Sequence, residues 1–138
     1  MATIGGSAPY TVTQRPATVI GVAASPTTTS TTDVDLPDMA VTLTTTGGDL
    51  LCLGVCVVGN STSATGNVYL TLSLDGTQKG MAALATPGIG NWDTVTVHDM
   101  LQGVAAGAHT VKLRWHTDGG TAVANGTQRA LTVVEIRR

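Results

Sequence analysis

The sequence predicts an all-β fold: an antiparallel β-sandwich of the jelly-roll kind, with eight to nine strands, preceded by an extended N-terminal arm. Three observations predict it. The 138 residues are rich in Thr, Val, Ala and Gly and contain no Phe, a composition that favours strands and turns. Apolar and polar residues alternate in runs that turn signals separate at short intervals. No stretch of ten or more residues combines helical periodicity with helix caps.

The first 32 residues differ from the rest of the chain. Residues 7–22 contain two short extended pieces, each beginning beside a proline, and residues 23–32 form a Thr/Ser tract with nothing to bury. We therefore expect residues 1–32 to form an extended arm and linker, and residues 33–138 to form one jelly-roll domain.

The first strands of the domain follow from residues 33–58. A strand over residues 33–46 is interrupted at Pro37 and Asp38, and Gly-Gly-Asp at 47–49 predicts a turn. Residues 50–58 are apolar on both parities, so both faces of this strand must be covered. We expect it to lie at a subunit interface, through Leu51, Leu53, Val55 and Val57 or through their opposite-parity neighbours.

The middle of the chain supplies the next strands. Residues 68–74 alternate in polarity, and Asp75 and Gly76 are the preferred pair for a two-residue hairpin turn. A weaker strand follows at residues 80–86, and residues 92–101 alternate again. Residues 102–107 then predict a turn.

The last part of the chain predicts a closing hairpin over residues 108–136, with its turn at the Gly-Gly pair 119–120. Val111, Leu113 and Trp115 share the inward parity, while Lys112 and Arg114 share the outward one. We expect the first of these two strands to be a core strand.

The charge content constrains the partners. Only 12% of residues are charged, against about 25% in average globular domains, which favours a homo-oligomer or attachment to a larger body. The formal net charge is −2, without a basic block, so we expect no nucleic-acid partner. The N-terminal residues lack a secretory signal pattern and no run reaches the roughly 18 apolar residues of a membrane helix. We expect synthesis in the cytoplasm, without export or membrane insertion.

The residues that could carry chemistry form no recognised motif. His109 and His116 differ in parity and point to opposite sheet faces, so with His98 they favour hydrogen-bonded or solvated histidines over a metal site. The triplet Asp33, Asp35 and Asp38 lacks the glycine and glutamate of a calcium loop. We expect no metal and no cofactor.

The possible nucleophiles and the aromatic residues do not predict a catalytic site either. No Gly-x-Ser-x-Gly elbow is present, and we expect no enzymatic activity. Cys52 and Cys56 would lie about 13 Å apart in a regular strand, too far for a disulfide, and are expected to be buried thiols. Trp92 and Trp115 could stack on sugars, although core packing is favoured for both.

Several segments in order resemble a known module. These are residues 41–51, residues 72–76, above all residues 107–115 (Gly-Ala-His-Thr-Val-Lys-Leu-Arg-Trp), and residues 119–122 with 129–135. Together they resemble the jelly-roll domains of tailed-bacteriophage virion proteins: capsid decoration proteins, head fibres and tail-fibre tips. The resemblance covers roughly residues 33–136.

The resemblance implies a homotrimeric, non-enzymatic β-sandwich on the virion surface. We expect a capsid decoration (cement) protein whose partner is the major capsid protein, because an extended arm suits strand addition to a neighbouring protein. The residues predicted to contact the capsid are Tyr10, Val12, Arg15, Val19 and Ile20. The first alternative is a receptor- or glycan-binding fibre tip that uses residues 59–66 and 87–92. The second is a signalling ligand of the tumour-necrosis-factor or C1q shape, which shares the fold but would usually be exported.

Overall fold

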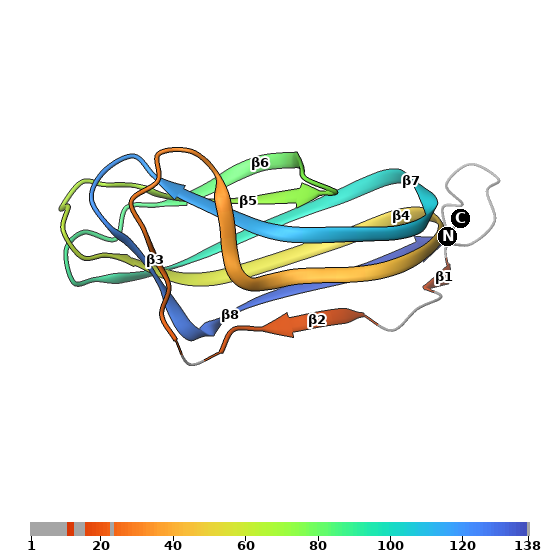
Figure 1. Cartoon of the computed structure of the whole chain (residues 1–138), viewed down its shortest axis with the longest axis horizontal. Helices are drawn as coiled ribbons and strands as arrows, with labels where there is room; N and C mark the ends of the chain where they lie inside the picture. The colour runs from red at the N-terminus through yellow and green to blue at the C-terminus, as the bar shows by residue number, and fades with distance from the viewer. Residues whose placement is uncertain (1–10, 13–15, 23, 138) are drawn as a thin grey trace, which may run out of the picture.

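The structure is a computed structural model that describes residues 11–12, 16–22 and 24–137. Its eight strands pair antiparallel, so the predicted all-β antiparallel sandwich is confirmed (Figure 1). The strands are β1 (Thr11–Val12), β2 (Ala17–Ile20), β3 (Thr27–Thr28), β4 (Val34–Asn60), β5 (Val68–Leu74), β6 (Thr77–Ala85), β7 (Trp92–Thr117) and β8 (Ala122–Arg137).

Two long strands run through both layers of the sandwich. Residues 34–46 of β4 pair with residues 106–115 of β7, and residues 50–59 of β4 pair with residues 92–101 of β7. The register shifts between Gly48 and Leu50, and the paired ribbon bends there (Figure 1). One continuous hydrogen-bonded sheet therefore folds onto itself into two packed layers, as in a jelly roll.

We name the two layers sheet I and sheet II. Sheet I contains β6, β5, the second half of β7 and the first half of β4, in that order. Sheet II contains the first half of β7, the second half of β4, and β8, whose other edge pairs with β1, β2 and β3.

The turns predicted at residues 47–49 and 102–107 are wrong, because both segments lie inside continuous strands. Gly47 and Gly107 have φ angles of 95° and 139°, which residues with a Cβ rarely adopt. A Cβ on Gly48 would come within 2.6 Å of the carbonyl oxygen of Ile136. The glycines mark the place where the ribbon bends from one layer to the other, and the chain does not reverse there.

The predicted closing hairpin is also wrong. The second half of β7 pairs with β4 and β5 in sheet I, whereas β8 pairs with β4 and the first three strands in sheet II. The Gly-Gly segment at 119–120 carries the chain across the sandwich, with Gly120 at φ 73°. The alternation was assigned correctly, but alternation does not specify which strand pairs with which.

The core lies between the two sheets and contains the side chains whose parity was predicted to point inward. Trp115, Leu113 and Val111 of β7 are buried, and so are Cys52 and Cys56 of β4. Burial raises the pKa of each thiol to about 12, so both cysteines are protonated side chains that pack as small apolar groups.

The predicted interruption of the first strand is a bulge within β4. The register shifts between Asp35 and Ala40, and Asp38 has a φ of 64°. Pro37 lacks the N–H that a regular ladder requires at every second residue, so the strand continues past it with an irregularity.

The arm contains strands that pair within the chain itself. β2 pairs with β8 over Ala17–Val133 to Ile20–Ala130, and β3 pairs with β8 at Val123 and Ala122. Figure 1 shows β2 running beside β8 along the edge of the sandwich. Strands β2 and β3 of the N-terminal segment are therefore part of sheet II.

Candidate interaction surfaces

The outer face of sheet II carries no Asp, Glu, Lys or Arg at the outward positions of β2, of residues 51–57 in β4, of residues 92–100 in β7, or of β8. Asp49, at the bend of β4 opposite Ile136, is buried and accepts a hydrogen bond from the N–H of Gly103 at 2.9 Å. His98, Leu53, Thr132 and Thr18 form one row across four strands, and the hydroxyls of Thr18 and Thr132 are 2.9 Å apart. We call the following outward residues the uncharged face: Thr18, Ile20, Leu51, Leu53, Val55, Val57, Thr94, Thr96, His98, Met100, Ala130, Thr132, Val134 and Ile136.

The uncharged face exposes large apolar side chains. Ile20 is 66% exposed, Leu53 46% and Met100 41%. Two hollows indent the face, one of about 230 Å³ beside Leu53 and one of about 300 Å³ beside Ile20 and Val57. A contiguous apolar sheet face with hollows is typical of an interaction surface rather than of solvent-facing structure.

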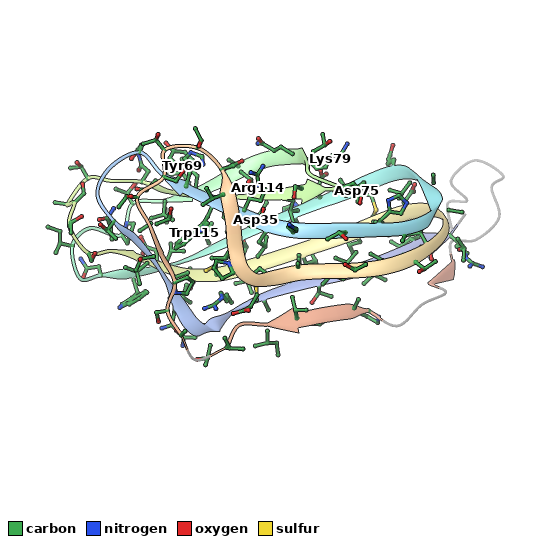
Figure 2. The ribbon with its side chains drawn as sticks, viewed as in Figure 1. Asp35, Tyr69, Asp75, Lys79, Arg114 and Trp115 are labelled. Atoms are coloured by element: carbon green, nitrogen blue, oxygen red, sulfur yellow. The ribbon has the colours of Figure 1, made fainter. Side chains whose placement is uncertain are left out.

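The outer face of sheet I carries charged side chains that form ion pairs with one another. Asp35 lies 2.6 Å from Lys112 Nζ and 3.3 Å from Arg114 Nε, and Figure 2 shows Asp35 and Arg114 together over this sheet. His116 Nδ1 lies 2.6 Å from Asp33. The two outer faces of the sandwich therefore differ in kind: one suits water and the other suits contact with protein.

A stacked ring pair extends the polar network of sheet I. The rings of Tyr69 and His116 are 4.4 Å apart and almost parallel. Tyr69 donates its hydroxyl proton to Asp118 at 3.1 Å, and this hydrogen bond raises the pKa of Tyr69. The stacked rings and this hydrogen bond join Asp118 to the polar network of sheet I.

The β5–β6 turn is attached to β7 by an imidazole. His109 Nδ1 is 2.7 Å from Asp75 Oδ2, and its Nε2 is 2.9 Å from the carbonyl oxygen of Ala105. Acceptors at both ring nitrogens raise the pKa of His109, the carboxylate of Asp75 contributing most. The backbone N–H of Thr110 and the His109 ring lower the pKa of Asp75.

The predicted trimer-interface residues all lie on the uncharged face. Leu51, Leu53, Val55 and Val57 point outward, while their neighbours of even number are buried in the core. The even-numbered side chains of this strand are thus covered by sheet I, whereas no strand among the described residues covers the odd-numbered ones.

The predicted capsid-contact residues are dispersed. Tyr10 and Arg15 lie outside the described residues, and Val12 lies in β1, opposite Ile136 of β8. Val19 packs against the chain's own core, because β2 is a strand of sheet II. Ile20 points the other way and joins the uncharged face.

Sequence reasoning missed a buried arginine that holds the arm in place. The fully buried Arg129 donates from Nη1 to the carbonyl oxygens of Ala24, Asn125 and Gly126 at 3.2, 2.8 and 2.7 Å. A Cβ on Gly21 would overlap the side chain of Arg129. No sequence signal marks this contact, because its partners are backbone carbonyls and the one that belongs to the arm, Ala24, is 105 residues away.

The two loops proposed for a fibre tip meet at one end of the sandwich. Asn60 bridges to Ile89, and the N–H of Gly90 donates to the carbonyl oxygen of Asn60 at 3.3 Å. Trp92 is 49% exposed and Ile89 57%, so the core position favoured for Trp92 is wrong, whereas Trp115 is buried as expected. A hollow of only about 70 Å³ lies beside Trp92.

The described residues contain no group of three His, Cys, Asp or Glu side chains that could hold a metal ion. In the part of the chain that the structure describes, no helix is long and apolar enough to cross a membrane.

Comparison with solved structures identifies the fold. The Eiger TNF of S. frugiperda matches with a TM-score of 0.53 and 10% identity over 87% of this chain and 90% of its own. Murine APRIL matches with a TM-score of 0.50 and 6% identity over 88% and 99%. A chain of infectious bursal disease virus strain Gx matches with a TM-score of 0.45 and 18% identity over 91% of this chain and 38% of that chain.

At these identities the likeness shows a shared fold, the TNF-like jelly roll of eight antiparallel strands. No protein-family model matches the sequence, and no curated protein matches it either.

Proposed function

We propose that this protein is a non-enzymatic structural protein that assembles as a homotrimer through the uncharged face. The observation that carries the proposal is the contrast between the two outer faces. Sheet I presents paired charges, whereas sheet II presents Leu53, Ile20 and Met100 with no charged neighbour on that face. Homotrimers are typical of TNF-like jelly rolls.

The mass of the assembly in solution tests this proposal. Sedimentation velocity of the full chain should give three times 14.0 kDa. Leu53→Lys places a cation on the uncharged face and should yield folded monomers, because a buried, unpaired charge opposes association. Ala108→Lys, on the outer face of sheet I, is the matched control and should leave the trimer intact. A wild-type monomer would overturn the proposal.

We propose further that the trimer decorates the capsid of a tailed bacteriophage, on the virion surface, after synthesis in the host cytoplasm. The resemblance of residues 33–136 to virion jelly-roll modules supports this role. A protein that binds only the assembled shell stabilises the shell by mass action. Since Val19 packs inward and Ile20 belongs to the uncharged face, the capsid contacts that we retain are Tyr10, Val12 and Arg15.

Capsid binding can be tested with expanded shells assembled from the major capsid protein encoded by the same genome. The protein should co-sediment with the shells and raise their melting temperature. Deletion of residues 1–15 should abolish co-sedimentation and leave the trimer intact, because β2 stays in sheet II. Truncation to residue 24 is unsuitable, since it also removes Val19 from the core and Ala24 from Arg129. Absence of co-sedimentation by the full chain would refute the decoration role.

A second candidate function is a receptor- or glycan-binding tip. It is favoured by the exposed rings and side chains of Trp92 and Ile89, on loops that meet at the end of the sandwich away from β1 (Figure 1). An exposed indole can stack on the apolar face of a sugar. Retention on host polysaccharide that Trp92→Ala abolishes and Trp92→Phe keeps, without any capsid binding, would select this function instead.

A further inference from the structure

We infer that His98 makes assembly through the uncharged face sensitive to pH, so that the trimer persists at neutral pH and dissociates in mild acid. The inference rests on the proposed homotrimer and names a regulation of that same surface. It is carried by the place of this histidine in the strand register and by the absence of charge around it.

His98 is the only ionisable side chain among the residues that make up the uncharged face. It stands opposite Leu53 of β4, and its nearest outward neighbours along β7 are Thr96 and Met100. Leu53 and Met100 are among the most exposed large apolar side chains of the chain. A partner that covers Leu53 and Met100 must therefore cover His98 as well.

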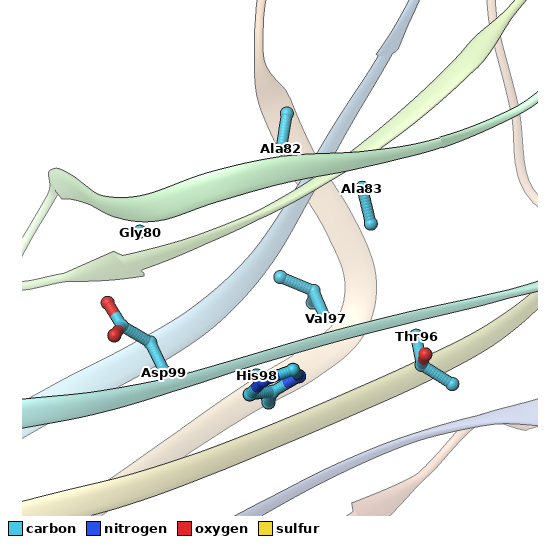
Figure 3. Close-up of a pocket in the computed structure, with 7 residues that line it drawn as sticks. All are labelled: Gly80, Ala82, Ala83, Thr96, Val97, His98 and Asp99. Carbon is cyan, nitrogen blue, oxygen red and sulfur yellow. The ribbon is translucent and has the colours of Figure 1, made fainter.

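Two indentations are lined in part by this residue. The hollow of about 230 Å³ on the uncharged face is lined by His98, Leu53 and Thr132 among others. A groove of about 410 Å³ between β6 and β7 is lined by His98 together with Gly80 and Asp99. His98 thus borders both hollows, and Figure 3 shows it on β7 among the residues that line the second one.

No carboxylate of the same chain faces this imidazole within the described residues. Asp99 lies on the other side of β7, where its Oδ1 accepts a hydrogen bond from the N–H of Met100 at 2.8 Å and its Oδ2 faces Gly80. Figure 3 shows Asp99 rising from β7 towards β6, away from His98. On β6, Lys79 precedes Gly80 and is the nearest basic residue in that strand.

The other strands that border His98 contribute only uncharged groups. From β4 these are Leu51, Leu53 and Val55, and from β8 they are Ala130 and Thr132. A protonated imidazole covered by such a surface would lose its hydration and gain no counter-charge.

The pH dependence of assembly follows from the linkage between proton binding and association. Histidine gains its charge between about pH 5 and 8 in water, and a neutral imidazole can be buried at far lower cost than an imidazolium. Protons therefore bind the free subunit more readily than the assembled one, and acid shifts the equilibrium towards free subunits. Each of the three buried imidazoles contributes up to about a tenfold loss in the association constant per pH unit.

Sedimentation velocity at pH 7.5 and pH 5.0 tests the inference on the full chain. The wild type should be a trimer at pH 7.5 and a monomer at pH 5.0, with an unchanged far-ultraviolet circular dichroism spectrum. His98→Gln keeps size and polarity without a titratable ring and should remain trimeric at both pH values. His116→Gln, on the charged face of sheet I, is the matched control and should dissociate in acid like the wild type.

The outcomes separate the inference from the proposal beneath it. A wild-type trimer that persists at pH 5.0, or a His98→Gln variant that dissociates as the wild type does, would overturn the role of His98 and leave the homotrimer standing. A wild type that is monomeric at pH 7.5 would overturn both.

Discussion

Gly54 of β4 lies directly beneath Leu113 of β7, and a Cβ on Gly54 would overlap the Cδ2 atom of that leucine and come within 3.0 Å of Val97 Cγ1. The side chain of Leu113 therefore occupies the space that a side chain at position 54 would need. This contact joins the centre of sheet II to the centre of sheet I.

Substitution of this glycine should therefore weaken the sandwich. Gly54→Ala forces Leu113 out of its position and should lower the free energy of unfolding by about 1–3 kcal/mol, as overpacked cores do. Urea denaturation at fixed protein concentration measures the loss. Gly119→Ala is the control, because a Cβ there would meet its neighbours only at ordinary contact distances. Equal stability of the two variants would contradict the packing described.

The buried guanidinium of Arg129 should be a strong determinant of stability. Arg129→Met leaves the carbonyl oxygens of Ala24, Asn125 and Gly126 without their donor and should cost about 3 kcal/mol. Amide hydrogen exchange should also accelerate in β2 and β3, which flank the segment that Arg129 holds. Lys112→Met, which breaks a solvent-exposed pair, should cost less than about 1 kcal/mol. Unchanged amide hydrogen exchange in β2 would contradict the conclusion that Arg129 holds the N-terminal segment in place.

The pair of His109 and Asp75 predicts a pH dependence with a definite sign. The pKa of His109 is raised above its usual 6.5, so the stability that His109 contributes is fully present below pH 6.5 and is lost as pH rises through the folded pKa. The stability advantage of wild type over His109→Gln should shrink from pH 6 to pH 9. An NMR titration of the ring protons should give a midpoint above 6.5, and a midpoint below that value would contradict the geometry.

Asp75 titrates with the opposite sign. Its pKa is lowered from 3.8, so the stability it contributes is present above that value and is lost as pH falls through the folded pKa. Asp75→Asn should remove this acid-labile part of the stability curve, which thermal unfolding between pH 2 and pH 5 measures. Loss of stability that begins well above pH 5 in both proteins would point to other groups.

The thiols of Cys52 and Cys56 should be inert in the folded protein. With each pKa at about 12, almost no thiolate exists at pH 8, and both side chains are buried. Iodoacetamide should modify neither cysteine in native buffer and both in guanidinium chloride, as mass spectrometry would show. Rapid labelling of the native protein would indicate that β4 opens readily.

The sequence predicted which side chains face the core, but it did not predict which strands pair with each other. Alternation assigned Val111, Leu113 and Trp115 to the core because the period of a strand is independent of its neighbours. The same alternation suits a hairpin or a crossover, so the Gly-Gly segment at 119–120 was interpreted as a hairpin turn although it connects two different sheets. Likewise, glycines within a long bent strand resemble the turns that separate short strands.

The candidate surface was foreseen only in part. Because residues 50–58 are apolar on both parities, the sequence predicted that both faces of this strand are covered. The register places Leu51, Leu53, Val55 and Val57 on the uncharged face. The contributions of Thr18, Ile20, Met100 and His98 come from two other strands, β2 and β7, and no local pattern links them.

By itself, the sequence determined which residues prefer strands, which side of each strand is apolar, and that the chain has few charges to place on its surface. The tertiary structure alone decided that Asp35, Lys112 and Arg114 pair over sheet I, that the residues of the uncharged face come together on sheet II, and that His98 stands beside Leu53. The physical reason is that periodicity and composition are local properties. The neighbours of a side chain across a sheet depend on strand pairing and register, which the whole core stabilises together.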